Sequence, residues 1–227
     1  MIPRPPNPIV VALDVSDLER ADALTRTLEG EVGLFKVGLE LFTAFGPEAV
    51  RRVRERGSVF LDLKLHDIPN TVERTARNCA RLGVSILTVH ALGGEAMIAA
   101  AVRGASIGAE ASGTEPPSIA AVTVLSSMGG ESLASPTSLA FEAMSAGATG
   151  VVASGEDVSE VRGVVGDAFC LIVPGIRPAG TNGHDQVRVL APEEAVEAGA
   201  VYLVIGRPIT DSPDPAGTAR SILTSIR

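Results

Sequence analysis

The feature that most constrains this chain is a repeated alternation of short apolar runs with longer stretches of helical periodicity. The runs are continuously apolar rather than alternating, which is typical of parallel strands buried on both faces. They cover residues 9–13, 33–37, 59–63, 85–89, 119–125, 150–153, 169–173 and 201–205. The helix candidates cover residues 17–28, 40–56, 68–82, 95–107, 138–146, 156–164, 192–198 and 215–226. Eight strand–helix units in 227 residues predict an α/β fold, a (β/α)₈ TIM barrel, as a single domain over residues 1–227.

An open, doubly wound sheet is the competing architecture. Its dinucleotide-binding form would carry a GxGxxG motif after the first strand, where bare backbone can approach a pyrophosphate. Here the first strand ends in LDVSD (residues 13–17), which favours the barrel. The polar segment 108–117 (GAEASGTEPP) is predicted to be a flexible loop before the fifth strand.

Charge and cysteine content exclude several classes of protein. The chain has 19 Lys and Arg against 27 Asp and Glu, a net charge of −8, so neither a nucleic-acid footprint nor a polybasic membrane arm is expected. No apolar run reaches the roughly 18 residues of a membrane helix. Cys79 and Cys170 are the only cysteines, and they lie outside any CxxC pair, which suits a reducing compartment. We therefore expect a cytoplasmic protein with buried thiols.

Charged residues gather where the first three predicted strands end, at the face of a barrel that carries the active site. They are Asp14, Lys36, Asp62 and Lys64, and Asp67 follows shortly after the third strand. Asp62, Lys64 and Asp67, with Lys36 from the neighbouring strand, are expected to form an alternating charge network. The alternation in Asp62-Leu63-Lys64 puts both charges on one face of a strand. Opposite charges side by side favour each other's ionised form. Because buried ion pairs are poor stabilisers, such a cluster at the barrel mouth indicates function.

A glycine–arginine group follows the last two strands. It comprises Pro174, Gly175, Ile176 and Arg177 after the seventh strand, and Gly206 with Arg207 after the eighth. Barrels commonly bind phosphate at this place, through backbone N–H groups and an adjacent cation. The sequence therefore predicts a phosphate site here, although that alone names no reaction.

The charged residues suggest a decarboxylation. A fixed carboxylate destabilises a substrate carboxylate, and an adjacent ammonium group stabilises the carbanion left when carbon dioxide departs. The same ammonium can deliver a proton, whereas a lysine between two aspartates is a poor Schiff-base nucleophile. A metal held by Asp62, His66 and His90 is disfavoured by the two neighbouring ammonium groups, so we expect no metal there.

Five segments together resemble the orotidine 5′-phosphate decarboxylase family. They are VALDVSD (11–17), FKVGLELF (35–42), DLKLHDIPNT (62–71), VPGIRPAG (173–180) and IGRPIT (205–210). The resemblance spans nearly the whole chain, and the DLKLHDIPNT segment is its most specific part. It implies a cofactor-free, homodimeric barrel that converts orotidine monophosphate to uridine monophosphate in pyrimidine synthesis.

The resemblance also implies roles for individual residues. Lys64 would protonate C6 of the pyrimidine, and Asp62 would press on the substrate carboxylate. Lys36 would bridge the charged residues and touch the ribose, while Asp14 would hold a ribose hydroxyl. Asp67, with Ile68 and Thr71, would reach into the partner subunit's active site. The remaining implied contacts are Ser126 to the pyrimidine, Arg177, Gln186, Gly206 and Arg207 to the phosphate, and Pro174 in a lid over residues 174–188.

Two rival functions stay open. A magnesium-dependent sugar-phosphate lyase of the same superfamily would need a metal-ligating acid on the second strand, where this chain has Lys36, which cannot ligate Mg²⁺. A catalytically silent nucleotide-binding barrel is the other rival, because a fold alone never establishes activity. Asp62, Lys64 and Asp67 count against it, since a binding module gains nothing from repelling its ligand's carboxylate.

Overall fold

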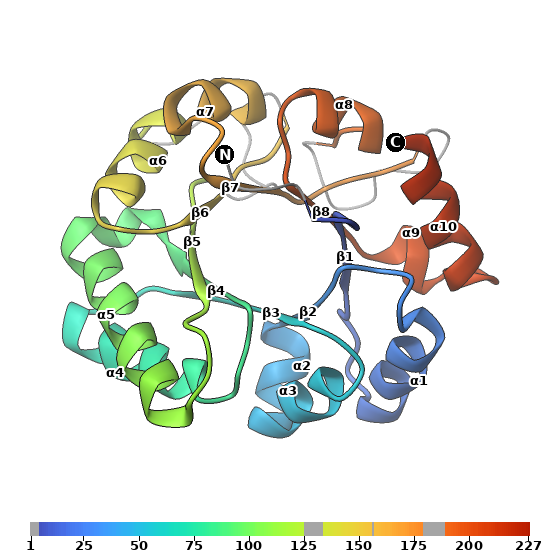
Figure 1. The fold of residues 1–227 in the computed structure, drawn as a ribbon, viewed down its shortest axis with the longest axis horizontal. Coiled ribbons are helices and arrows are strands. Elements are labelled where there is room, and N and C mark those ends of the chain that lie inside the picture. The colour runs from blue at the N-terminus through green and yellow to red at the C-terminus, as the bar shows by residue number, and fades with distance from the viewer. Residues whose placement is uncertain (1–4, 125–133, 156, 179–188) are drawn as a thin grey trace.

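The fold is a closed barrel of eight parallel strands surrounded by helices. The computed structural model describes residues 5–124, 134–155, 157–178 and 189–227. Its strands are β1 (Ile9–Ala12), β2 (Leu34–Gly38), β3 (Val59–Leu65), β4 (Ile86–His90), β5 (Ser118–Val122), β6 (Gly150–Val152), β7 (Cys170–Val173) and β8 (Tyr202–Ile205). Each strand pairs with the next in chain order, and β8 closes the ring against β1. The predicted TIM barrel is thus confirmed, and the open sheet is excluded (Figure 1).

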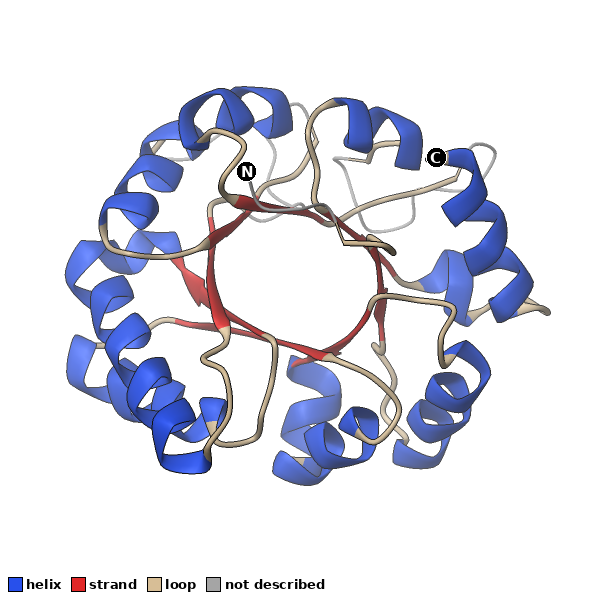
Figure 2. Ribbon diagram, viewed as in Figure 1, coloured by secondary structure: helices blue, strands red, loops and turns tan. Residues whose placement is uncertain are grey.

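Helices ring the barrel on its outside (Figure 2). They are α1 (Leu18–Leu28), α2 (Leu39–Phe45), α3 (Pro47–Arg54), α4 (Pro69–Ala80), the short 3₁₀ helix η1 (Ala91–Gly93), α5 (Gly94–Ser112), α6 (Pro136–Ser145), α7 (Asp157–Val165), α8 (Pro192–Glu197), α9 (Arg207–Thr210) and α10 (Pro215–Ser225). The Asp17 carboxylate accepts from the N–H of Glu19 at the start of α1, and Ser135 and Asp214 cap α6 and α10 in the same way. No helix within the described ranges is long and apolar enough to cross a membrane.

Two apolar layers hold the fold together. The larger one lies between the strands and the helices, and the smaller one fills the barrel interior with residues such as Val10, Leu34, Phe60 and Ile86. Successive residues of a strand point to opposite faces, so residues two positions later continue the interior row. In β2 and β3 that next interior position is charged. The barrel is therefore apolar inside and becomes polar only towards the carboxyl ends of its strands.

Both cysteines are buried and free, as expected. Cys79 lies in α4, and burial raises the pKa of its thiol to about 11. Cys170 faces the barrel interior, where burial raises its pKa to about 12. Thiols with such values are largely protonated at neutral pH and have little reactivity.

Two predicted elements were wrong, and one helix was not predicted. The single helix expected over residues 40–56 is broken at Gly46, whose φ of 58° is left-handed, and Pro47 starts α3. The loop expected over residues 108–117 begins only at Gly113, the left-handed C-cap of α5. Gly108 lies inside α5, at a place where α5 passes close to α4. A Cβ there would lie 2.2 Å from the carbonyl oxygen of Arg77, so this helix position needs glycine. The four-residue helix α9 was not predicted.

Candidate active site

A cavity of about 410 Å³ opens at the carboxyl ends of the strands. This volume lies within the range of about 300–1,000 Å³ that small-molecule sites occupy. The described residues that line it are Ala12, Asp14, Lys36, Phe60, Asp62, Lys64, Val122, Val124, Val152, Pro174, Gly175, Ile176, Arg177, Val204, Gly206, Arg207 and Thr210. The charged residues of the first three strands and the glycine–arginine residues of the last two therefore share one cavity.

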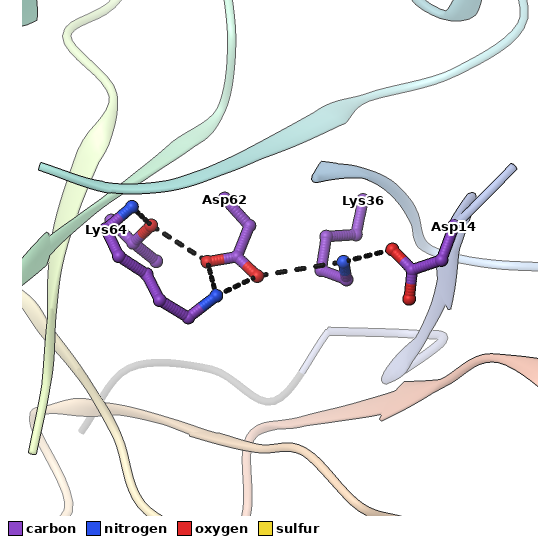
Figure 3. A network of polar contacts seen from close by, with 5 residues as sticks. Asp14, Lys36, Asp62 and Lys64 are labelled. Atoms are coloured by element: carbon purple, nitrogen blue, oxygen red, sulfur yellow. Dashed lines mark hydrogen bonds and ion pairs between the residues drawn. The ribbon is translucent and has the colours of Figure 1, made fainter. Parts of the chain in front are cut away.

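Four of these residues form a chain of alternating charges, which we call the charged cluster: Asp14, Lys36, Asp62 and Lys64 (Figure 3). The Lys64 ammonium nitrogen lies 2.9 Å from each carboxylate oxygen of Asp62. The Lys36 ammonium nitrogen lies 2.8 Å from Oδ1 of Asp14 and 3.7 Å from Oδ2 of Asp62. The structure thus brings these four residues together, whereas Asp67, which was also expected in the charge network, lies outside the cavity lining.

Asp62 is held in its ionised form. Burial, the largest influence, opposes ionisation, but the ammonium groups of Lys36 and Lys64 and hydrogen bonds from Lys64 and Thr88 together outweigh it. The pKa of Asp62 therefore lies below its ordinary value. At neutral pH the cavity presents a carboxylate whose charge is fixed beside an ammonium group that could donate a proton.

The lysine that contacts Asp62 has an unusual backbone conformation. Lys64 has a φ of 48°, the only left-handed φ of a non-glycine residue within the described ranges. That conformation costs an L-residue about 1–2 kcal/mol. Such strain typically persists at functional sites, where the surrounding structure over-determines it.

Gly38 leaves the space that the Lys36–Asp14 ion pair occupies. A Cβ on Gly38 would lie 2.9 Å from the Lys36 ammonium nitrogen and 3.1 Å from Oδ1 of Asp14. The backbone of Gly38 is extended, with φ −93° and ψ −175°, so its conformation does not itself require glycine. The glycine is needed here because the two charged side chains fill the position.

The opposite rim of the cavity is formed by the glycine–arginine side, by which we mean residues 174–177, 206 and 207. Gly175 has a left-handed φ of 76°, and the N–H of Arg177 donates to the carbonyl of Leu190 at 2.9 Å. Gly206 precedes α9, whose first residue is Arg207. Guanidinium groups beside glycine backbone suit a planar or tetrahedral anion such as phosphate.

The structure does not bring every predicted residue to this cavity. Asp67, Ile68 and Thr71 are exposed and lie outside the lining set, with the Asp67 carboxylate accepting the N–H of Ile68 at 2.7 Å. Ser126 and Gln186 fall outside the described residues, as does the part of the predicted lid over residues 179–188.

His66 and His90 stack on each other beside the charged cluster. Their ring centroids lie 5.2 Å apart, and Nδ1 of His90 accepts the N–H of Leu92. Burial, followed by the charges of His66 and Lys64, lowers the pKa of His90. Within the described residues, no group of three or more His, Cys, Asp or Glu side chains is placed to hold a metal ion.

Sequence reasoning missed two features of the site. Thr88 of β4 was not singled out, although a hydroxyl in the middle of a buried apolar run has to find a partner. The chain also contains only two lysines, Lys36 and Lys64, against seventeen arginines. Both lysines lie in the charged cluster, and a lysine ammonium group, unlike a guanidinium group, can release a proton.

Comparisons with known proteins identify the family. Residues 7–222 match the model of a family described as "Orotidine 5'-phosphate decarboxylase / HUMPS family". An orotidine 5′-phosphate decarboxylase of Moorella thermoacetica is 49% identical over 96% of this chain and 91% of its own length. One from an Anaeromyxobacter species is 48% identical over 98% of this chain and 100% of its own length.

Solved structures give the same result. The crystal structure of an orotidine 5′-phosphate decarboxylase from Lactobacillus acidophilus superposes with a TM-score of 0.85 at 35% identity, covering 97% of this chain and 99% of that one. The corresponding enzyme of Pyrococcus horikoshii gives a TM-score of 0.77 at 28% identity over 96% and 99% of the two chains. The chain therefore belongs to the orotidine 5′-phosphate decarboxylase / HUMPS family.

Proposed function

We propose that this chain is a cofactor-independent carboxy-lyase that decarboxylates orotidine monophosphate to uridine monophosphate in pyrimidine biosynthesis. The observation that carries the proposal is the Asp62–Lys64 pair, a buried carboxylate in contact through both oxygens with an ammonium group inside the cavity. Relatives with nearly the same length are named for this activity. A magnesium-dependent reaction is disfavoured because Lys36, rather than an acid, projects from β2.

In the proposed reaction the substrate carboxylate lies against Asp62, and the repulsion is relieved as the bond between C6 and the carboxyl carbon breaks. Carbon dioxide leaves, and the electron pair of that bond stays on C6. The Lys64 ammonium first stabilises this charge and then gives C6 a proton, which the amine regains from solvent. The short contacts of Lys64 with Asp62 support this proposal, because they would hold the proposed proton donor in one position.

The rest of the nucleotide would bind across the cavity. Asp14 and Lys36 would contact the ribose, and Arg177, Gly206 and Arg207 the phosphate; all five residues line the cavity. We further propose that residues 174–188 close over the phosphate as a lid with Gln186 among its contacts, and that Ser126 contacts the pyrimidine. These assignments follow the family resemblance together with the shared cavity.

We also propose a homodimer with shared active sites. Asp67 and Thr71 are exposed at the start of α4, and the apolar side chain of Ile68 between them is 65% exposed. Leu39 and Leu92, after the neighbouring strands β2 and β4, are each 52% exposed. Contact with a second copy would cover these apolar groups and bring Asp67 to the partner's Lys64. The free, buried cysteines suit a reducing compartment, so we propose a cytoplasmic enzyme.

The direct test follows the ultraviolet absorbance of orotidine monophosphate after purified protein is added in the presence of EDTA. We expect a fast decline with uridine monophosphate as the product. A decline that occurs only after Mg²⁺ is supplied would contradict the cofactor-independent mechanism. If no decline occurs while uridine monophosphate binds tightly, the chain is a nucleotide-binding barrel without this activity.

A further inference from the structure

Strand β3 is irregular opposite Thr88 of β4. Phe60 pairs with Ile86 and Leu61 with Leu87, but the next pair is Leu65 with Val89. Residues 62–64 therefore face the single residue Thr88, and the regular ladder of backbone hydrogen bonds is interrupted there. A buried amide left by such an interruption needs another partner.

The Thr88 side chain supplies that partner and makes a second contact as well. Its hydroxyl is in a residue with 0% exposure, and it accepts the backbone N–H of Lys64 at 2.8 Å. The same hydroxyl donates to Oδ1 of Asp62 at 2.9 Å. One hydroxyl thus joins the backbone of the lysine to the carboxylate that this lysine contacts through its ammonium group.

We propose that Thr88 is a positioning residue for the Asp62–Lys64 pair. By accepting the Lys64 N–H it holds the left-handed backbone from which the lysine side chain turns back towards Asp62. By donating to Oδ1 it fixes the plane of the carboxylate, so that both oxygens stay within 2.9 Å of the ammonium nitrogen. The β-branched side chain restricts its own χ1 rotation, which keeps the hydroxyl in place. The effect on the rate rests on the proposed decarboxylase function, whereas the effect on the position of Lys64 does not.

Two replacements separate the hydroxyl from the shape of the side chain. Thr88→Val keeps the branched shape and loses the hydroxyl, and Thr88→Ser keeps the hydroxyl. We expect Thr88→Val to lower kcat about 10- to 100-fold, since a small displacement of a reacting group is costly to the rate. KM should change less than about threefold, because Thr88 contacts Asp62 but is not among the described residues that line the cavity. Thr88→Ser should keep kcat within about threefold of the wild type.

The pH profile gives a readout that a merely structural role would not change. A hydrogen bond to the ionised form of a carboxyl group lowers its pKa, so loss of the Thr88 bond raises the pKa of Asp62. The acid limb of kcat/KM should therefore move to higher pH in Thr88→Val and return in Thr88→Ser. Thr25→Val is the matched control: Thr25 is equally buried, but its hydroxyl donates to the carbonyl of Asp22 in α1.

A spectroscopic measurement tests the position of Lys64 without any substrate. Protein labelled with ¹³C at lysine Cε gives two lysine side-chain signals, because the chain has only two lysines, and Lys64→Arg assigns them. We expect the Lys64 signal to move in Thr88→Val and Thr88→Ala, and to stay in Thr88→Ser and Thr25→Val. Unmoved signals and unchanged kcat in folded Thr88→Val and Thr88→Ala would overturn the inference. If the wild-type protein leaves orotidine monophosphate intact, the proposed function fails, and the Lys64 signal still decides whether Thr88 positions the pair.

Discussion

The two sides of the cavity differ in how they are built. On the β1–β3 side the charged side chains form ion pairs with one another, whereas on the β7–β8 side short glycine-containing turns precede arginines. In the charged cluster, Lys36 is 2.8 Å from Asp14, and Lys64 is 2.9 Å from Asp62. On the glycine–arginine side, Gly175 adopts a left-handed turn, and Gly206 immediately precedes Arg207 and the four-residue helix α9.

The difference separates two tasks. The charged cluster is joined by its own ion pairs, an arrangement that suits groups proposed to act on the transition state. In the proposed function, the glycine–arginine side would bind the phosphate through backbone N–H groups and arginines. Replacements in the charged cluster should therefore lower the rate more than the affinity, and replacements on the other side should lower both.

The largest effect is expected for Lys64→Ala, which removes the proposed proton donor. We expect kcat for orotidine monophosphate to fall by at least about 10³-fold, while the affinity for uridine monophosphate changes less than about threefold. Steady-state kinetics and calorimetric titration measure the two quantities. Lys64→Arg is the matched variant, because it keeps the positive charge but a guanidinium does not release its proton. Full activity of Lys64→Arg, or equal losses of rate and affinity in Lys64→Ala, would contradict the proton-donor role.

The second prediction concerns Asp67, which lies outside the charged cluster of its own chain and is proposed to act in the partner subunit's active site. If Asp67 works in the partner's active site, mixing inactive Lys64→Ala and Asp67→Ala chains creates heterodimers with one complete site. Random exchange of subunits should then restore about a quarter of wild-type activity. Native mass spectrometry confirms that heterodimers have formed. Their presence without activity would place Lys64 and Asp67 in the site of one chain.

Arg207→Ala tests the glycine–arginine side. Loss of a charge-assisted contact to phosphate should weaken uridine monophosphate binding about 10- to 100-fold, and kcat should also fall if that contact drives closure over the substrate. The control is Arg220→Ala, which removes a surface arginine of α10 paired with Glu31. An unchanged kcat at saturating substrate would show that the phosphate serves only to hold the nucleotide.

Ionisation of Asp62 should appear in the stability of the protein as well. Because the pKa of Asp62 is lowered by folding, its contribution is fully present above its ordinary pKa of 3.8 and is lost as the pH falls through the lower folded value. Asp62→Asn should therefore reduce the free energy of unfolding by about 1–3 kcal/mol at pH 7, and the difference should shrink below pH 3.8. Urea unfolding at several pH values measures it. Asp167→Asn is the control, because Asp167 is exposed and its replacement should change the free energy of unfolding by less than about 0.5 kcal/mol. A difference between wild type and Asp62→Asn that stays the same at every pH would argue against an ion-paired carboxylate.

Much of the fold and half of the site follow from local patterns in the sequence. Eight apolar runs are enough to predict a barrel, and the charged residues that end the first three strands do meet in one cavity. Simple alternation in β3 does not explain the Asp62–Lys64 contact, because the strand is irregular there and Lys64 has a left-handed φ. The end of α5 was not predictable in this way, because Gly108 looks like a loop residue until its contact with Arg77 in α4 is known.

The role of Thr88 was also out of reach, for a different reason. Its two partners lie on another strand, and they come within reach only because β3 contains an irregularity that no local pattern signals. The number of lysines, by contrast, was available from composition. Two lysines among nineteen basic residues already single out Lys36 and Lys64.

Gly38→Ala tests how closely the charged cluster is packed, and its effect should be the smallest. The new methyl group would lie 2.9 Å from the Lys36 ammonium nitrogen, so Lys36 and Asp14 must move apart or shift together. The extended backbone at Gly38 accepts alanine, so the protein should stay folded while kcat/KM falls about three- to tenfold. Gly163→Ala in α7 is the control, because nothing lies within 4 Å of its added Cβ and alanine favours the helix. If Gly38→Ala is as active as Gly163→Ala, the Lys36–Asp14 pair is not held in one geometry, and the contrast between the two sides of the cavity is weaker than the ion-pair distances indicate.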